Sequence, residues 1–264
     1  MKVRNLFFTV AALSAICTQA ATFECGGLYY TTTGANTVAV ARVPAEKATN
    51  NPYKGVYIIP EQVYYDGANY QVTAIADSAF FQSKATEVQV PNTVTTIGEC
   101  AFAYATDLAN ITLPLHLKDV SKMLLAGTNV VNVAVPEGVT TIGWGAFQSC
   151  PMLHTMLLPS TTKRIDAYGY NNCHNLFEIY CAAPTAPEAS GWAIFIGLSG
   201  IDVIVPDDDA VAKYAANAVW GDENTFKLYP SEEVSISMTG EVEKYNDHYM
   251  RFALGNNLAY KIYK

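Results

Sequence analysis

Between residues 72 and 181 the hydrophobic positions recur with a fixed period. Short segments of the type Val-Thr-x-Ile end at Ile75, Ile97, Val120, Ile142 and Ile165, which lie 22, 23, 22 and 23 positions apart. Three other landmarks keep this phase: a small residue followed by a large apolar one, a proline, and a pair of alternating apolar residues. Because composition alone would not keep four landmarks in one register, the pattern indicates an internal repeat.

Each repeat unit predicts one short strand and a return segment. Met156 and Leu158 alternate and so lie on one face of a strand, and Pro159 ends that strand because proline has no amide N–H to donate. One unit of this length cannot bury its own apolar face, whereas stacked units can. We therefore predict a β-rich solenoid with a parallel sheet along one face.

The pattern Val-Thr-x-Ile-Gly-x-x-Ala-Phe-x-x-Cys-x-x-Leu-x-x-Ile-x-Ile-Pro resembles the BspA-like (Treponema-type) leucine-rich-repeat surface protein family. Residues 142–153 follow it closely. The third unit departs, with Leu124-Leu125 in place of Ala-Phe, and the fifth has Gly169-Tyr170; both keep bulk inside. The resemblance covers residues 70–181. It implies a leucine-rich-repeat solenoid with a β-rich N-terminal cap and a C-terminal capping repeat, used for adhesion and for binding host matrix proteins.

The flanking residues predict the elements of these caps. Gly34-Ala35-Asn36 and Asp66-Gly67 each lie between β-rich segments, which predicts two hairpins. Asp207-Asp208-Asp209 precede an Ala-rich run up to Trp220, which predicts a capped helix with acidic residues in its first turn. A calcium site is the alternative for these aspartates, but the spaced ligands and glycine of a calcium loop are missing. We expect Tyr214, Trp220 and Phe226 to pack this element on the last coil.

The first twenty residues are typical of a secretory signal peptide. Lys2 and Arg4 precede an apolar run, and small residues stand before a cleavage site between Ala20 and Ala21. A membrane anchor is the alternative, but the apolar run is shorter than the ~20 residues that a span needs. Lipoprotein cleavage before Cys17 is a second alternative, disfavoured because Ile16 is bulky where such a signal has a small residue. We predict export to the cell surface, outer envelope or extracellular space, with no transmembrane segment in the mature chain.

These signals divide the chain into five parts. The tail resembles no repeat, although residues 234–238, 249–254 and 258–263 have strand-like patterns around a turn at Gly255-Asn256-Asn257. The predicted parts are a signal peptide (1–20), a β-rich N-terminal cap (21–70), the leucine-rich repeats (71–181), a C-terminal capping repeat with a helix (182–230) and a β tail of unknown role (231–264).

Composition narrows the partner class. The 264 residues are 50% hydrophobic with a net charge of −8, and an acidic chain lacks the clustered Lys and Arg that nucleic acids require. The mature chain keeps five cysteines, and an odd number without paired spacing predicts neither a disulfide framework nor a zinc site. We expect them to be small buried side chains, with Cys150 and Cys173 stacked in adjacent coils.

Catalytic motifs are missing from the sequence. The four histidines (His116, His154, His174 and His248) have no metal-ligand spacing, and there is neither a phosphate-binding glycine loop nor a Gly-x-Ser-x-Gly elbow. Cys173 and His174 are neighbours, but a nucleophile and its base normally meet across the fold. The sequence predicts no enzyme, no cofactor and no metal.

The outer face of the predicted sheet supplies a candidate binding site. Side chains between the buried pairs point outward, and polarity falls along that column until Leu157, Tyr180 and Ile204 form an apolar cluster. The predicted ligand-binding residues are Thr155, Leu157, Glu178, Tyr180, Asp202 and Ile204. The alternative is that the tail, residues 231–264, folds back over this cluster.

The sequence thus predicts a secreted or cell-surface macromolecule-binding scaffold of the adhesion type. Its partner is expected to be a protein or glycan, with host extracellular molecules among the candidates. Two alternatives stay open. One is a carbohydrate-binding accessory protein of the cell envelope, which tyrosine-rich open surfaces also suit. The other is a purely structural envelope component.

Overall fold

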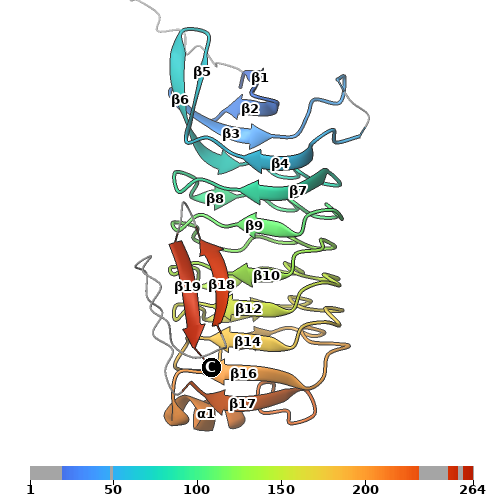
Figure 1. Cartoon of the computed structure of the whole chain (residues 1–264), viewed down its shortest axis with the longest axis vertical. Coiled ribbons are helices and arrows are strands. Elements are labelled where there is room, and N and C mark those ends of the chain that lie inside the picture. Colours follow the sequence, from blue (N-terminus) through green and yellow to red (C-terminus); the bar gives the residue numbers. More distant parts are fainter. Residues whose placement is uncertain (1–19, 48–49, 232–248, 255–257, 264) are drawn as a thin grey trace, which may run out of the picture.

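A computed structural model describes residues 20–47, 50–231, 249–254 and 258–263, and every structural statement below refers to them. The chain forms a β-solenoid of about six turns stacked along its long axis, with a curled mixed sheet at one end and a short helix at the other (Figure 1). The predicted fold class is confirmed. The predicted signal peptide and the expected strand at 234–238 lie outside the described residues.

The first turns are capped by a mixed sheet that contains both predicted hairpins. β2 pairs with β3, and β5 pairs with β6, each antiparallel. Asp66 and Gly67 at the second turn have φ of 47° and 80°, which is the geometry of a tight hairpin turn. The sheet order is β1-β2-β3-β6-β5, and its strands are β1 (Thr22–Cys25), β2 (Leu28–Thr32), β3 (Thr37–Ala41), β5 (Gln62–Tyr65) and β6 (Ala68–Ile75).

The repeat strands stack in parallel on one side of the solenoid. The predicted single sheet is divided into two, with orders β4-β7-β9 and β10-β12-β14-β16-β17. Pairing within each sheet keeps the predicted register, since Glu87 lies beside Asn110 and Asn132 beside Thr155. The strands are β4 (Lys54–Ile58), β7 (Lys84–Gln89), β9 (Asn110–Thr112), β10 (Asn132–Ala134), β12 (Thr155–Leu158), β14 (Glu178–Cys181), β16 (Ile201–Val205) and β17 (Phe226–Pro230).

The Val-Thr-x-Ile segments form a second stack of short strands. Their sheet order is β11-β13-β15, while β8 pairs with β6 of the cap. Gly143 follows β11 where coils touch closely, because a Cβ there would lie 2.7 Å from the Val120 carbonyl oxygen of the preceding coil. The glycine of the repeat pattern therefore permits close stacking. The strands are β8 (Thr96–Ile97), β11 (Thr141–Ile142), β13 (Arg164–Asp166) and β15 (Glu188–Ser190).

The core is filled by the large apolar residues of successive coils. Phe80 stacks on Phe102 with ring centroids 5.1 Å apart, and Leu124 and Leu125 fill the equivalent place in the third unit, fully buried. The substitution of Leu-Leu for Ala-Phe therefore preserves the core, as expected.

The cysteines follow the prediction only in part. Cys150, Cys173 and Cys181 are buried, whereas Cys25 and Cys100 are partly exposed, and all five are free thiols. The Cys150 Sγ–H donates to the Leu125 carbonyl at 3.1 Å and the Cys173 Sγ–H to that of Phe147 at 2.9 Å. Each of these two thiols thus ties its coil to the one before it.

The C-terminal cap contains the predicted helix and an additional strand. α1 (Asp208–Ala215) begins after Asp207, whose side chain accepts a 2.8 Å hydrogen bond from the Ala210 amide. It ends before the Ala-rich run does. Tyr214, Trp220 and Phe226 are buried at the last coil, as predicted. β17, which was not predicted, extends the parallel sheet by one strand.

The tail contains a hairpin. β18 (Tyr249–Leu254) and β19 (Leu258–Tyr263) pair antiparallel, which confirms both expected strands. The expected turn between them lies outside the described residues. β18 lies against β10, on the side of the repeat strands (Figure 1).

Candidate functional site

The six predicted ligand-binding residues come together in two rows across β12, β14 and β16. One row places Glu178 between Thr155 and Asp202. The other row consists of Leu157, Tyr180 and Ile204. We call these six residues the sheet patch.

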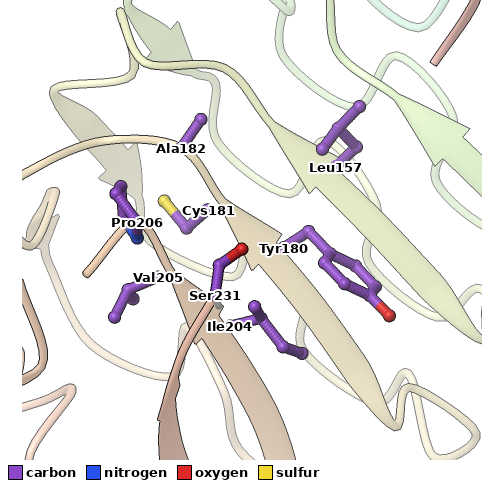
Figure 2. A pocket seen from close by; sticks show the side chains of 8 residues that line it. All are labelled: Leu157, Tyr180, Cys181, Ala182, Ile204, Val205, Pro206 and Ser231. Carbon is purple, nitrogen blue, oxygen red and sulfur yellow. The ribbon is translucent and has the colours of Figure 1, made fainter. Parts of the chain in front are cut away.

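The apolar row of the sheet patch is covered, so the prediction of an exposed cluster is wrong. Leu157, Tyr180 and Ile204 expose only 2%, 4% and 7% of their surface. Beside them lies a cavity of about 160 Å³ that Ser231 also lines (Figure 2). The Tyr180 hydroxyl donates to Glu178 at 3.3 Å, and burial raises the Tyr180 pKa above its usual range. Within the patch, only Glu178 and Asp202 are partly exposed.

A second candidate site lies in the turns that follow β11, β13 and β15. Trp144, Tyr168 and Trp192 stand there on three successive coils, and we call them the aromatic strip. The ring centroids of Trp144 and Tyr168 are 5.2 Å apart, as are those of Tyr168 and Trp192. Trp192 is 71% exposed and Trp144 38%, while Tyr168 is half-buried. Such exposed aromatic groups are typical of binding surfaces.

Polar groups flank the aromatic strip. The Lys122 ammonium lies 5.6 Å from the centre of the Trp144 ring. On β13, the Arg164 Nε lies 2.9 Å from the Asp166 Oδ1, and Asp166 stands two residues before Tyr168. The strip thus has apolar ring faces beside donors and acceptors.

Glycines stand next to the two tryptophans of the strip in the sequence. Trp144 stands between Gly143 and Gly145, and Trp192 follows Gly191. Gly191 has a φ of 109°, and a Cβ there would lie 2.7 Å from the Ala167 Cβ. Sequence reasoning missed the strip, although two tryptophans beside glycine, 48 residues apart, were a signal that could have found it.

The described residues contain no arrangement suited to metal binding. No three His, Cys, Asp or Glu side chains gather there as a metal would require. The Cys173 thiol is buried against a carbonyl, whereas His174 is exposed and its Nδ1 lies 3.1 Å from the Gly197 carbonyl oxygen. Within the same residues, no helix has the length and hydrophobicity of a membrane span.

Comparison with known families identifies the repeats. Residues 73–186 match the model of the BspA type leucine rich repeat region in six copies. The central part of this chain is a BspA-type leucine-rich-repeat region. Proteins of this kind are scaffolds and are generally not catalytic. Comparison with curated protein sequences finds no match.

Solved structures of bacterial proteins resemble this chain to different degrees. A T. pallidum leucine-rich-repeat protein is 23% identical, with a TM-score of 0.54 over 67% of this chain and 77% of its own. A leucine-rich cell surface protein from Faecalibacterium prausnitzii is 16% identical, with a TM-score of 0.27 over 72% and 86% of the two chains. The pneumococcal vaccine antigen PcpA is 11% identical, with a TM-score of 0.47 over 80% and 71%. The first similarity establishes the fold alone.

Proposed function

We propose that this protein is exported, stays at the cell surface or in the outer envelope, and acts as an adhesion-type scaffold that binds another macromolecule. The observation that carries the proposal is the aromatic strip: Trp144 and Trp192 are exposed on the two outer coils of three, with Tyr168 on the coil between them. Aromatic groups held in this way are typical of recognition surfaces. The signal-like residues 1–20 and the BspA-type repeats support a location at the cell surface or in the outer envelope. The proposal includes the division of the chain into the five parts that the sequence predicts.

We further infer that the chain works by binding and not by catalysis. The family consists of scaffolds, and the one adjacent Cys–His pair places its two side chains in different surroundings. A binding assay addresses the proposal directly. Residues 21–264 are tested against immobilised extracellular matrix proteins and against a glycan array. Saturable binding to either class supports the proposal, whereas inertness toward both would indicate a structural envelope component.

For the sheet patch, we propose that the C-terminal tail and not an external ligand occupies the apolar row. The support is the burial of Leu157, Tyr180 and Ile204 and the position of β18 against β10 of the same sheet. A ligand that uses this patch would then contact Glu178 and Asp202, or would replace the tail.

The double variant Leu157→Asp/Tyr180→Asp separates these cases. With the tail in place, two carboxylates would be buried without partners, so we expect a loss of several kcal/mol, on the order of 3–5, from the free energy of unfolding. Glu178→Gln is the control and should leave the urea midpoint nearly unchanged, because its carboxylate is partly exposed. A double variant that folds normally but loses ligand binding would assign the patch to an external ligand.

A further inference from the structure

The aromatic strip has the shape of a narrow platform. It is one ring wide and three coils long, with equal steps of 5.2 Å between ring centroids. The interplanar angles are 57° and 66°, so neighbouring rings do not cover each other face to face. Trp192 is 71% exposed, whereas Trp144 is 38% exposed and has the Lys122 ammonium over its ring, 5.6 Å from the ring centre.

We propose that Trp144, Tyr168 and Trp192 form a binding site for a neutral glycan chain. This inference rests on the proposed binding function and names its ligand class. A sugar ring has one face of C–H groups and an edge of hydroxyls. The C–H face packs on an aromatic ring because both are apolar and the ring face carries partial negative charge. A chain of sugars therefore fits a line of separate aromatic faces.

Polar groups beside the strip match the hydroxyl edge. The ion pair with Asp166 uses Nε of Arg164, and a guanidinium carries further N–H donors in a planar fork. The Arg164 side chain is 48% exposed, so these donors are accessible to sugar hydroxyls. Asp166 supplies acceptor oxygens, and Lys122 adds a donor at the Trp144 end.

A hollow lies next to the residues on both sides of Trp192, at one end of the strip. A surface hollow of about 510 Å³ is lined by Gly191 and Ala193 on the strip side and by Asp222 and Thr225 on the far side. Hydrogen bonds from Thr225 and Asn224 lower the pKa of Asp222, so this carboxylate is an acceptor at neutral pH. The hollow therefore offers room and a polar group where a glycan chain would extend past the last ring.

Width and charge favour a neutral glycan over a protein or a polyanion. A stable protein interface buries about 800 Å² per partner around a broad apolar centre, whereas this single line of rings has Lys122 over Trp144 and the Arg164–Asp166 ion pair on the strand that leads to Tyr168. Positive and negative groups are mixed there, and the net charge of −8 repels polyanions. Neither property favours an acidic polysaccharide.

Intrinsic tryptophan fluorescence tests the proposal on residues 21–264. Two of the three tryptophans belong to the strip, and Trp220 is buried. The probes are soluble neutral polysaccharides, namely a β-glucan, a mannan and a galactan, with heparin as the polyanion. We expect saturable fluorescence changes with at least one neutral polysaccharide and none with heparin. Trp144→Ala and Trp192→Ala should each weaken binding about tenfold or more.

Matched controls make the result specific. Tyr64→Ala removes an aromatic ring that is 66% exposed in the N-terminal cap and should leave the affinity unchanged. Trp192→Phe keeps a ring and should retain most of the affinity. Absence of binding to all neutral polysaccharides overturns the glycan site, and so does an affinity of the two alanine variants that equals that of the unmodified protein.

The same variants separate this inference from the proposed function. If the protein binds a matrix protein and no glycan, the scaffold proposal stands and the glycan site fails. If the alanine variants abolish protein binding instead, the strip is a protein site and the inference is again overturned. Inertness toward every probe refutes both.

Discussion

The same three coils carry two aromatic ladders, which have similar spacing but differ in the inclination of their rings. The inner ladder consists of Phe147, Tyr170 and Phe195, with centroids 5.4 and 5.6 Å apart and rings parallel to within 2° and 7°. The outer ladder is the aromatic strip, whose steps are 5.2 Å and whose rings are inclined by 57° and 66°.

The difference follows from what surrounds each ladder. Phe147 and Tyr170 are fully buried, so close-packed neighbours hold equivalent rings of successive coils in equivalent orientations. The outer rings lie on turns beside glycines, where few atoms determine their orientation. Repetition alone therefore does not impose parallel stacking. The inner ladder contributes to stability, whereas the outer ladder is free to serve recognition.

The largest expected effect comes from deleting one inner ring. Phe147→Ala should lower the free energy of unfolding by ~3–5 kcal/mol, because it removes a fully buried ring and leaves a cavity. Trp144→Ala, three residues earlier but on the outer ladder, should change it by only about 0.5 kcal/mol. Urea unfolding of both variants measures this contrast. An unchanged urea midpoint for Phe147→Ala would refute the repeat register.

A smaller effect is expected where the backbone shapes the outer ladder. Gly191→Ala combines a positive φ with a Cβ placed 2.7 Å from that of Ala167, and should cost about 2 kcal/mol. Gly138→Ala is the control, since Gly138 also has a positive φ but no atom lies within 4 Å of the added Cβ. If Gly191→Ala and Gly138→Ala lose the same stability in thermal unfolding, the contact with Ala167 contributes nothing to the loss.

Phe147 and Tyr170 of the inner ladder could be predicted from the sequence because they follow the repeat, whereas Phe195, 25 residues after Tyr170, was not predicted. The landmarks around Phe147 and Tyr170 recur at 22 or 23 residues, and the pairing of Leu157 with Tyr180 confirms the register derived from them. Within the repeats, the close-packed core tolerates little departure from the spacing of 22 or 23 residues. The pattern is therefore visible in a single sequence.

The rest could not be predicted, for two physical reasons. Trp144, Tyr168 and Trp192 are 24 residues apart, and Trp144 and Tyr168 do not occupy equivalent positions of the repeat: aligning by the core phase places Ala167, and not Tyr168, beside Trp144. The burial of Leu157 depends on what covers the sheet in the folded chain, and a local pattern of alternating residues carries no information about it.

The smallest expected effect concerns the one hydroxyl in the inner ladder. The Tyr170 hydroxyl is buried and has no hydrogen-bond partner among the described residues, and burial raises its pKa. Removing an unsatisfied buried hydroxyl relieves its desolvation cost, so Tyr170→Phe should stabilise the protein by about 1 kcal/mol. Tyr214→Phe should act in the opposite direction by a similar amount, because its hydroxyl donates to the Ala183 carbonyl at 3.0 Å. Urea unfolding at neutral pH measures the change in the free energy of unfolding for both variants. A loss of stability in Tyr170→Phe would mean that the hydroxyl of Tyr170 is hydrogen-bonded in solution.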